Sequence, residues 1–172
     1  MIAFLRIIIL LGAIQGFITS SLFFYSGKNR RSNRILSVLI FLISFASFNL
    51  YASYANWFGS TRLSFISNFV PLFMLMPVGP LIFFYVKSLL DPDFVITKKQ
   101  RLHFLPVIID LVPSLAALIY ILGTMLKIFK HDPQSWGNFI DNYNVYSDIP
   151  RWISITSYLW LTARFLSRFK AK

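Results

Sequence analysis

The sequence predicts an all-α fold, a polytopic bundle of about five transmembrane helices, and three observations lead to that prediction. Hydrophobic residues make up 56% of the 172 residues and charged residues only 13%, whereas soluble domains carry roughly 25% charged residues. Long runs without any charge recur along the chain. The basic residues fall in short clusters between these runs. A soluble globule could not cover so much apolar surface, so we expect a lipid bilayer around the chain.

The uncharged runs are long enough to be helices that cross a hydrocarbon core, which takes about 20 residues. The predicted spans cover about residues 4–25, 35–57, 64–86, 104–126 and 149–166 of a single transmembrane domain, residues 1–172. The fifth span is the weakest, because Arg151 and Arg164 lie near its ends, where long basic side chains can reach the headgroups. Between the fourth and fifth spans we expect a polar loop from Lys127 to Asp148.

The distribution of Lys and Arg predicts the orientation, because cytoplasmic loops carry an excess of basic residues. With the N-terminus outside, the inner segments hold twelve basic residues: Lys28, Arg30, Arg31, Arg34, Lys87, Lys98, Lys99, Arg101, Arg164, Arg168, Lys170 and Lys172. The outer segments hold the other five: Arg6, Arg62, Lys127, Lys130 and Arg151. We therefore expect the N-terminus outside and the C-terminus in the cytoplasm.

The net charge of +11 has a second interpretation, contact with nucleic acid. Basic residues that bind DNA usually cluster on one face of a folded soluble module. Here they lie between uncharged runs, and no polar stretch is long enough to fold as a helix-turn-helix. We expect the basic residues to set membrane topology, with no direct nucleic-acid binding by this chain.

Polar and small residues share one face of the first span. Gly12, Gln15, Gly16, Thr19 and Ser20 recur at helical spacing. The small residues of this set would let another helix approach closely. Gln15 is a candidate for a ligand cavity or for a hydrogen bond across a helix interface, and the spacing favours the interface.

The second span carries a similar polar face. Ala46, Asn49, Ser53 and Asn56 recur at steps of three and four. An unpaired amide in hydrocarbon costs several kcal/mol. We expect these residues to point into the bundle, with Asn49 as a candidate for helix packing or ligand contact.

The third span contains a cluster of helix-breaking residues, Pro71, Pro77, Gly79 and Pro80. Each proline removes a backbone donor and clashes with the preceding turn, so we expect a kinked or locally unwound helix. Broken helices mark binding sites or gates in some transporters, and kinks also occur as plain packing features. These four residues form a candidate hinge.

Asp110 is the only ionisable residue well inside a predicted span. An intramembrane carboxylate is a functional-site candidate, and the competing interpretation is an aspartate that holds two helices together. His103 shares its helix face but lies two turns away, so we expect no metal pair and no cofactor. No Glu, Gly-rich phosphate loop or nucleophile elbow occurs, so we expect no catalytic residues and no enzyme.

Three motifs carry a resemblance to a known family. They are Gly-Ala-Ile-Gln-Gly at 12–16, Gly-Pro-Leu-Ile-Phe-Phe-Tyr-Val-Lys-Ser-Leu at 79–89 and Leu-His-Phe-Leu-Pro at 102–106. In this order and spacing they resemble the membrane-embedded N-terminal half of AraC-type transcriptional regulators of Bacteroidetes-like bacteria. The matching residues are Gly12, Gln15, Gly16, Gly79, Pro80, Tyr85, Lys87, His103, Phe104 and Pro106.

The resemblance extends from about residue 8 to the end and implies a function. In that family a bundle of about seven helices precedes a cytoplasmic helix-turn-helix domain, which has no counterpart here. The resemblance therefore implies a membrane sensor or anchor module of the bacterial inner membrane, truncated or free-standing. Its implied partners are the bilayer, a second copy of the chain, and a separate DNA-binding partner or a missing C-terminal domain. The alternative is a small transporter or channel-like subunit with a midplane site at Asp110.

Overall fold

The structure is a computed structural model that describes residues 2–59, 63, 66–67, 69–91, 93–129 and 132–170. These residues form helices and no strands, which confirms the predicted all-α class. The main helices of this part are α1 (Ile2–Tyr25), α2 (Arg30–Tyr54), α4 (Val78–Leu90), α6 (Ile108–Met125) and α7 (Pro133–Lys170). The shorter elements are the 3-10 turns η1 (Trp57–Gly59) and η2 (Leu102–Val107) and the four-residue helix α5 (Lys98–Arg101).

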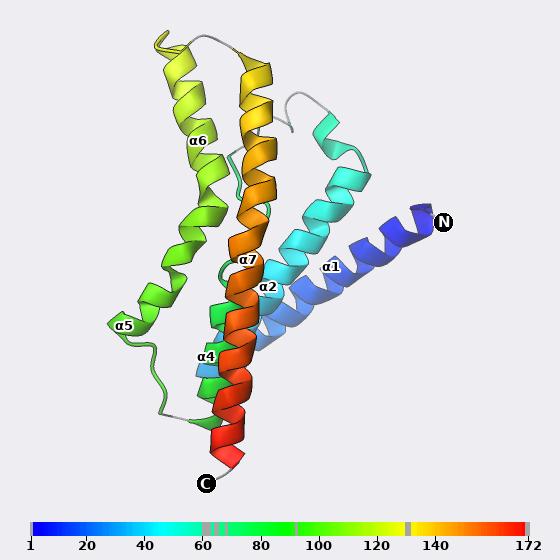
Figure 1. Cartoon of the computed structure of the whole chain (residues 1–172). Helices are drawn as coiled ribbons and strands as arrows, with labels where there is room; N and C mark the ends of the chain where they lie inside the picture. Colours follow the sequence, from blue (N-terminus) through cyan, green and yellow to red (C-terminus); the bar gives the residue numbers. More distant parts are fainter. Residues whose placement is uncertain are drawn as a thin grey trace.

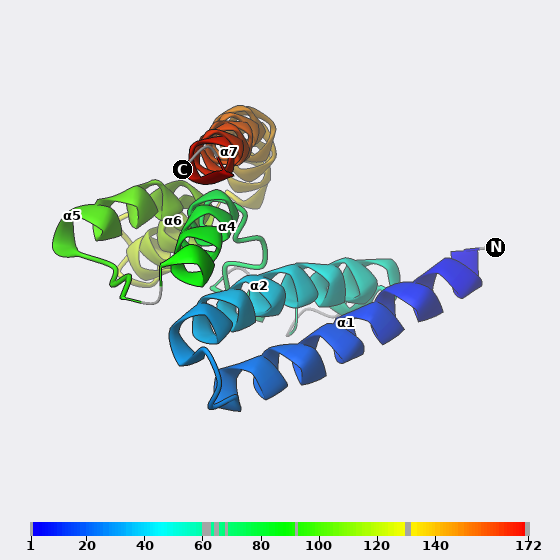
Figure 2. The ribbon, with the colours of Figure 1, turned by 90° about the horizontal axis from the view of Figure 1, so that it is seen from below.

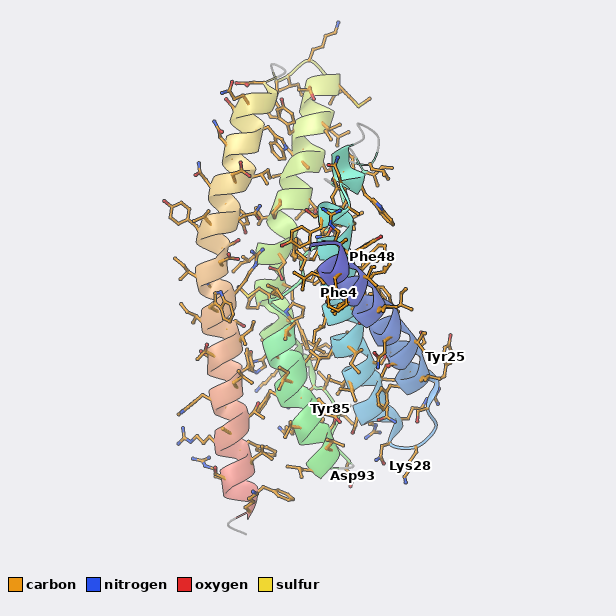
Figure 3. All side chains as sticks on the ribbon, turned by 90° about the vertical axis from the view of Figure 1, so that its right-hand side faces the viewer. Phe4, Tyr25, Lys28, Phe48, Tyr85 and Asp93 are labelled. Atoms are coloured by element: carbon orange, nitrogen blue, oxygen red, sulfur yellow. The ribbon has the colours of Figure 1, made fainter. Side chains whose placement is uncertain are left out.

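The helices pack in series. α1 lies along α2, α2 contacts α4, α4 contacts α7, and α6 contacts α7 (Figure 2). Lys28, in the turn between α1 and α2, and Asp93, after α4, lie at one end of the molecule (Figure 3). The C-terminal end of α7 points the same way (Figure 1). The helices thus run back and forth between two ends, as a chain that crosses a bilayer repeatedly would.

Three helical stretches are long and apolar enough to cross a membrane. They are Ala3–Tyr25, Arg30–Tyr54 and Lys98–Met125. Many of their large apolar side chains face outward, for example Leu22, Leu105 and Ile119. Lipid surroundings account for such outward apolar surface, so the chain has the character of a membrane protein.

The third predicted span is locally unwound, as expected, but only ahead of α4. Residues 71–75 have no regular structure and α4 begins only at Val78. Pro77 is the N-cap of α4 and Pro80 lies in its first turn, where a missing N–H leaves no helical hydrogen bond unmade. The prolines therefore define the start of a helix instead of kinking one. Residues 64, 65 and 68 of this span lie outside the described part.

The prediction of a loop from Lys127 to Asp148 is wrong over most of this range, because α7 already begins at Pro133. The prediction failed because it was based on the polar composition of this range. The early turns of α7 pack against α6 through aromatic side chains: Trp136 stacks on Tyr120 with ring centroids 4.9 Å apart. Tyr143 Oη donates a hydrogen bond to the carbonyl oxygen of Ile109 at 2.7 Å. A helix with one face held in this way can be polar elsewhere.

Small residues hold α1 against α2. Ala13 and Ser20 are buried, and Ser20 Oγ donates to the carbonyl oxygen of Ser37 at 2.9 Å. Gly16 faces Ser44 so closely that a methyl group on Gly16 would overlap the Ser44 side chain. The expected small-residue interface thus exists, and it is centred on Ala13, Gly16 and Ser20.

Serine also joins α2 to α4. Ser32 Oγ donates to the carbonyl oxygen of Ser88 at 2.9 Å, and both residues are buried. Beside this bond, Leu39 of α2 packs with Val78 and Leu81 of α4. Close packing and hydrogen bonds between helices are the interactions expected to hold a bundle together where lipid surrounds it.

Gly79 allows α4 to approach α7 closely, and we predict that Gly79→Ala destabilises the bundle. An added Cβ would lie 2.9 Å from Cδ2 and 3.1 Å from Cβ of Tyr158. We expect the free energy of unfolding in detergent micelles to fall by about 1–3 kcal/mol, the usual effect of overpacking. Gly12→Ala is the matched control, because within the described part of the chain its added Cβ meets no atom within 4 Å beyond its neighbours and the backbone of its own helix. Equal unfolding temperatures for the two variants would contradict this packing.

Candidate functional site

Asp110 is the centre of the candidate site and joins three parts of the chain. It lies in the first turn of α6, which continues directly from η2, and it is 3% exposed. Its Oδ1 accepts a hydrogen bond from Arg151 Nε of α7 at 2.8 Å. Its Oδ2 accepts one from the backbone N–H of Met76 at 2.7 Å, just before α4. One carboxylate therefore links α6, α7 and the unwound segment.

Arg151 is the partner that sequence reasoning missed. The sequence placed it at the outer interface, with its side chain reaching the headgroups, and this prediction is wrong. Its side chain is only 8% exposed and forms two ion pairs, with Asp110 at 2.8 Å and with Asp148 at 3.0 Å. Asp148 lies three residues earlier on α7, and its side chain is 60% exposed. The buried arginine is thus neutralised by a buried carboxylate and a solvated one.

The prediction for Asp110 left two interpretations open, a ligand site and an aspartate that holds helices together. The geometry supports the second directly, because the carboxylate bonds to two neighbouring segments. It leaves the first open, because a cavity lies beside the same group. Ionised side chains inside a membrane bundle typically pair with one another, and this pair follows that pattern.

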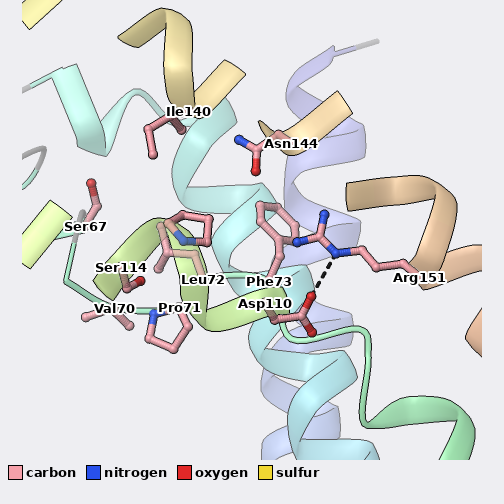
Figure 4. A pocket seen from close by; sticks show the side chains of 11 residues that line it. Ser67, Val70, Pro71, Leu72, Phe73, Asp110, Ser114, Ile140, Asn144 and Arg151 are labelled. Atoms are coloured by element: carbon pink, nitrogen blue, oxygen red, sulfur yellow. Dashed lines mark hydrogen bonds and ion pairs between the residues drawn. The ribbon is translucent and has the colours of Figure 1, made fainter. Parts of the chain in front are cut away.

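The cavity has a volume of about 240 Å³ and lies between the unwound segment, α6 and α7 (Figure 4). Its described lining consists of Ser67, Val70, Pro71, Leu72, Phe73, Asp110, Pro113, Ser114, Ile140, Asn144 and Arg151. Irregular backbone is tolerated at membrane depth where it is buried in protein or lines a cavity. The stretch from Val70 to Phe73 lines this cavity, which gives a physical reason for the unwound segment.

The four candidate hinge residues fall into two groups. Pro71 lies in the unwound segment and lines the cavity. Pro77, Gly79 and Pro80 lie at the start of α4, and Gly79 and Pro80 are buried. The structure therefore places the candidate hinge on both sides of Met76, whose N–H binds Asp110.

Two of the three family-like motifs meet in an aromatic cluster. Phe84 of α4, 1% exposed, lies with its ring centroid 5.8 Å from that of Phe104 and 5.6 Å from that of His103. His103 Nδ1 and Tyr158 Oη of α7 are 2.6 Å apart, a hydrogen bond. The remaining positions are close by in sequence: Tyr85 is half-buried on α4, Lys87 Nζ lies 4.9 Å from the ring centroid of Phe94, and Pro106 lies in η2.

The first motif stands apart from this cluster. Gly12 and Gln15 are exposed on α1, so the structure gives Gln15 neither a cavity nor a helix interface within the described chain. The interface keeps Gly16 and Ser20 of the predicted face and adds Ala13 in place of Gly12 and Gln15. A helix turns by 100° per residue, and spacing alone did not separate the two faces.

Asn49 is buried, as predicted, at 4% exposed. Its Oδ1 has no hydrogen-bond partner within the described residues. Ser53 and Asn56, predicted to share its inward face, are exposed, so that part of the prediction is wrong. The helix ends at Tyr54, and Asn56 adopts a left-handed conformation with φ 59°, which takes it off the face.

Fold and site together define a helical membrane protein with a buried ion pair beside a small cavity. The described residues bring together no group of three or more His, Asp, Glu or Cys side chains that could hold a metal ion. No protein-family model, curated protein or solved structure matches this chain.

Proposed function

We propose that this chain is the sensor or anchor module of an AraC-type transcriptional regulator of the bacterial inner membrane. The support from the sequence is the three motifs that resemble that family. The support from the geometry is the Asp110 carboxylate, which connects Met76 with Arg151 beside a cavity. A signal that changes this junction would act on three segments at once.

The route from the junction to the cytoplasmic side follows from the packing. Met76 lies two residues before α4, and α4 packs along α7 through Gly79 and Tyr158. Both helices run toward the end where the C-terminus lies (Figure 1). We propose that a signal in the cavity shifts the unwound segment, and that α4, the segment from Lys87 to Arg101 and α7 pass this shift to a DNA-binding partner or domain.

A deletion of the gene tests this proposal through its effect on transcripts. We expect deletion to change a small set of transcripts and the wild-type chain to restore them. Ser114→Leu is expected to accumulate in membranes and fail to restore them, because Ser114 lines the cavity. Leu115→Phe is the matched control, since Leu115 is 52% exposed on the same helix. Unchanged transcripts on deletion, or full rescue by Ser114→Leu, would refute the proposal.

The alternative function is transport, and the cavity beside a buried ion pair favours it as a second candidate. Transport predicts that proteoliposomes swell faster than protein-free vesicles in a gradient of a small uncharged solute such as glycerol. It also predicts that Asp110→Asn abolishes this difference. Wild-type swelling equal to that of protein-free vesicles, together with an intact transcript response, would leave the sensor as the better account.

A further inference from the structure

The cavity beside Asp110 contains a buried guanidinium that is not fully used. Arg151 is 7% exposed. Its two ion pairs use Nε and Nη1, and within the described part of the chain Nη2 has no partner. Figure 4 shows the guanidinium directed into the cavity, near Phe73 and Asn144. Nη2 itself is not fully buried, so an acceptor that enters the cavity can reach it and gain a charge-assisted hydrogen bond.

The charges around Nη2 restrict what can bind there. Asp110 and Asp148 carry two negative charges against the single positive charge of Arg151. An anion at Nη2 would therefore face two carboxylates that already neutralise the guanidinium. A cation would meet the guanidinium itself at close range. A neutral hydrogen-bond acceptor satisfies the donor without either repulsion.

The rest of the cavity sets the size and polarity of the occupant. The wall from Val70 to Phe73 and Ile140 is apolar, and three neutral polar residues line the rest: Ser67, Ser114 and Asn144. At about 240 Å³ the volume lies below the range of roughly 300–1,000 Å³ typical of pockets for drug-sized ligands. An occupant with a short aliphatic chain and one polar head fits these walls.

We propose that this cavity binds a small uncharged amphiphile whose carbonyl oxygen accepts a hydrogen bond from Arg151 Nη2. Amides of short aliphatic acids are the simplest members of this class. Asn144 and Ser114 also line the cavity and supply further polar side chains there. The ligand class deepens the proposed sensor function, on which its role as a signal rests, and binding itself can be measured separately.

Three probes of equal chain length and different charge test the ligand class. Hexanamide, hexanoate and hexylammonium are titrated by isothermal calorimetry into the full chain in lipid nanodiscs, with empty nanodiscs as the blank. We expect saturable binding of hexanamide and binding of the two ions weaker by about tenfold or more, a difference of about 1.4 kcal/mol. Binding of hexanoate as tight as that of hexanamide would overturn the proposed class.

Variants distinguish binding of hexanamide in the cavity from its partitioning into the lipid. We expect Ser114→Leu, which fills the cavity, to abolish saturable binding of hexanamide and Leu115→Phe to leave it unchanged. Arg151→Lys keeps a positive charge but lacks Nη2, so we expect about a tenfold loss of affinity in that variant. Because Arg151→Lys can also fail to fold, the Ser114→Leu variant is the decisive test of the binding site. Equal hexanamide binding by the wild type and Ser114→Leu would refute the site.

The outcomes distinguish the two proposals. Saturable binding of hexanamide with no transcript response would contradict the sensor function and leave the ligand site standing. A transcript response that Ser114→Leu abolishes, without binding of hexanamide, would contradict the ligand class and leave the sensor function standing.

Discussion

Asp110→Ala is expected to lower the free energy of unfolding by about 3–5 kcal/mol, the usual cost of removing one partner of a buried ion pair. The substitution leaves the guanidinium of Arg151 buried with only the solvated Asp148 as a counter-charge. It also leaves the N–H of Met76 without its acceptor. Unfolding of the purified chain by a graded transfer from mild detergent to denaturing detergent measures the loss.

Asp148→Ala is the matched control for this prediction. Asp148 binds the same guanidinium, but its side chain is 60% exposed, and exposed ion pairs contribute about 0–1 kcal/mol. We further expect the double variant Asp110→Ala with Arg151→Ala to be less destabilised than the sum of its single variants, because no buried charge is left unpaired and Asp148 is solvated. Equal losses of unfolding free energy for Asp110→Ala and Asp148→Ala would contradict a buried ion pair between Asp110 and Arg151.

Phe84→Ala is expected to cost about 3–5 kcal/mol, the range for a fully buried phenylalanine. Its ring contacts Phe94, His103 and Phe104, so its removal empties the centre of the aromatic cluster between α4 and η2. The same unfolding measurement applies. The ring of His103 would also lose its edge contact, although its hydrogen bond to Tyr158 stays possible.

Phe4→Ala is the control for the aromatic cluster. Phe4 is 66% exposed on α1, and substitutions at such positions usually change stability by no more than about 0.5 kcal/mol. A loss for Phe84→Ala within the range of the Phe4→Ala control would show that the two family-like motifs do not form one packed unit.

The helical class and the membrane character could be predicted from the sequence because both depend on local composition. Uncharged runs about as long as a bilayer is thick are visible without any tertiary information. The unwound third segment was also predictable, since proline removes a backbone donor wherever it occurs. What local signals could not give was the extent of α7, whose early turns are polar and depend on packing of Tyr120 against Trp136.

Only one residue of the central ion pair, Asp110, could be predicted from the sequence. Asp110 stood out as a charge within an apolar run, but its partner Arg151 lies 41 residues away and was predicted to reach the headgroup region. The signal that could have identified it is the expectation that opposite charges within spans pair with each other. The Met76 contact had no such signal, because a backbone N–H has the same chemistry at every position except proline.

Gln15 shows that helical spacing alone does not predict which residues of a helix face are buried. Its face of α1 had the expected small and polar residues, yet α2 packs against Ala13, Gly16 and Ser20. Adjacent helix faces overlap in the residues they contain, and only the partner helix decides which of them is buried. The precise face of an interface is a tertiary property.

We expect these helices to cross a bilayer with the basic clusters on one side. The chain has no cysteine, so single cysteines at Lys98, Gln134 and Leu115 can be labelled with a membrane-impermeant maleimide. We predict labelling of Lys98→Cys only in inverted vesicles, of Gln134→Cys only in right-side-out vesicles, and of Leu115→Cys only after detergent is added. Labelling of Lys98→Cys and Gln134→Cys from the same side, or recovery of the chain in the soluble fraction, would contradict the account.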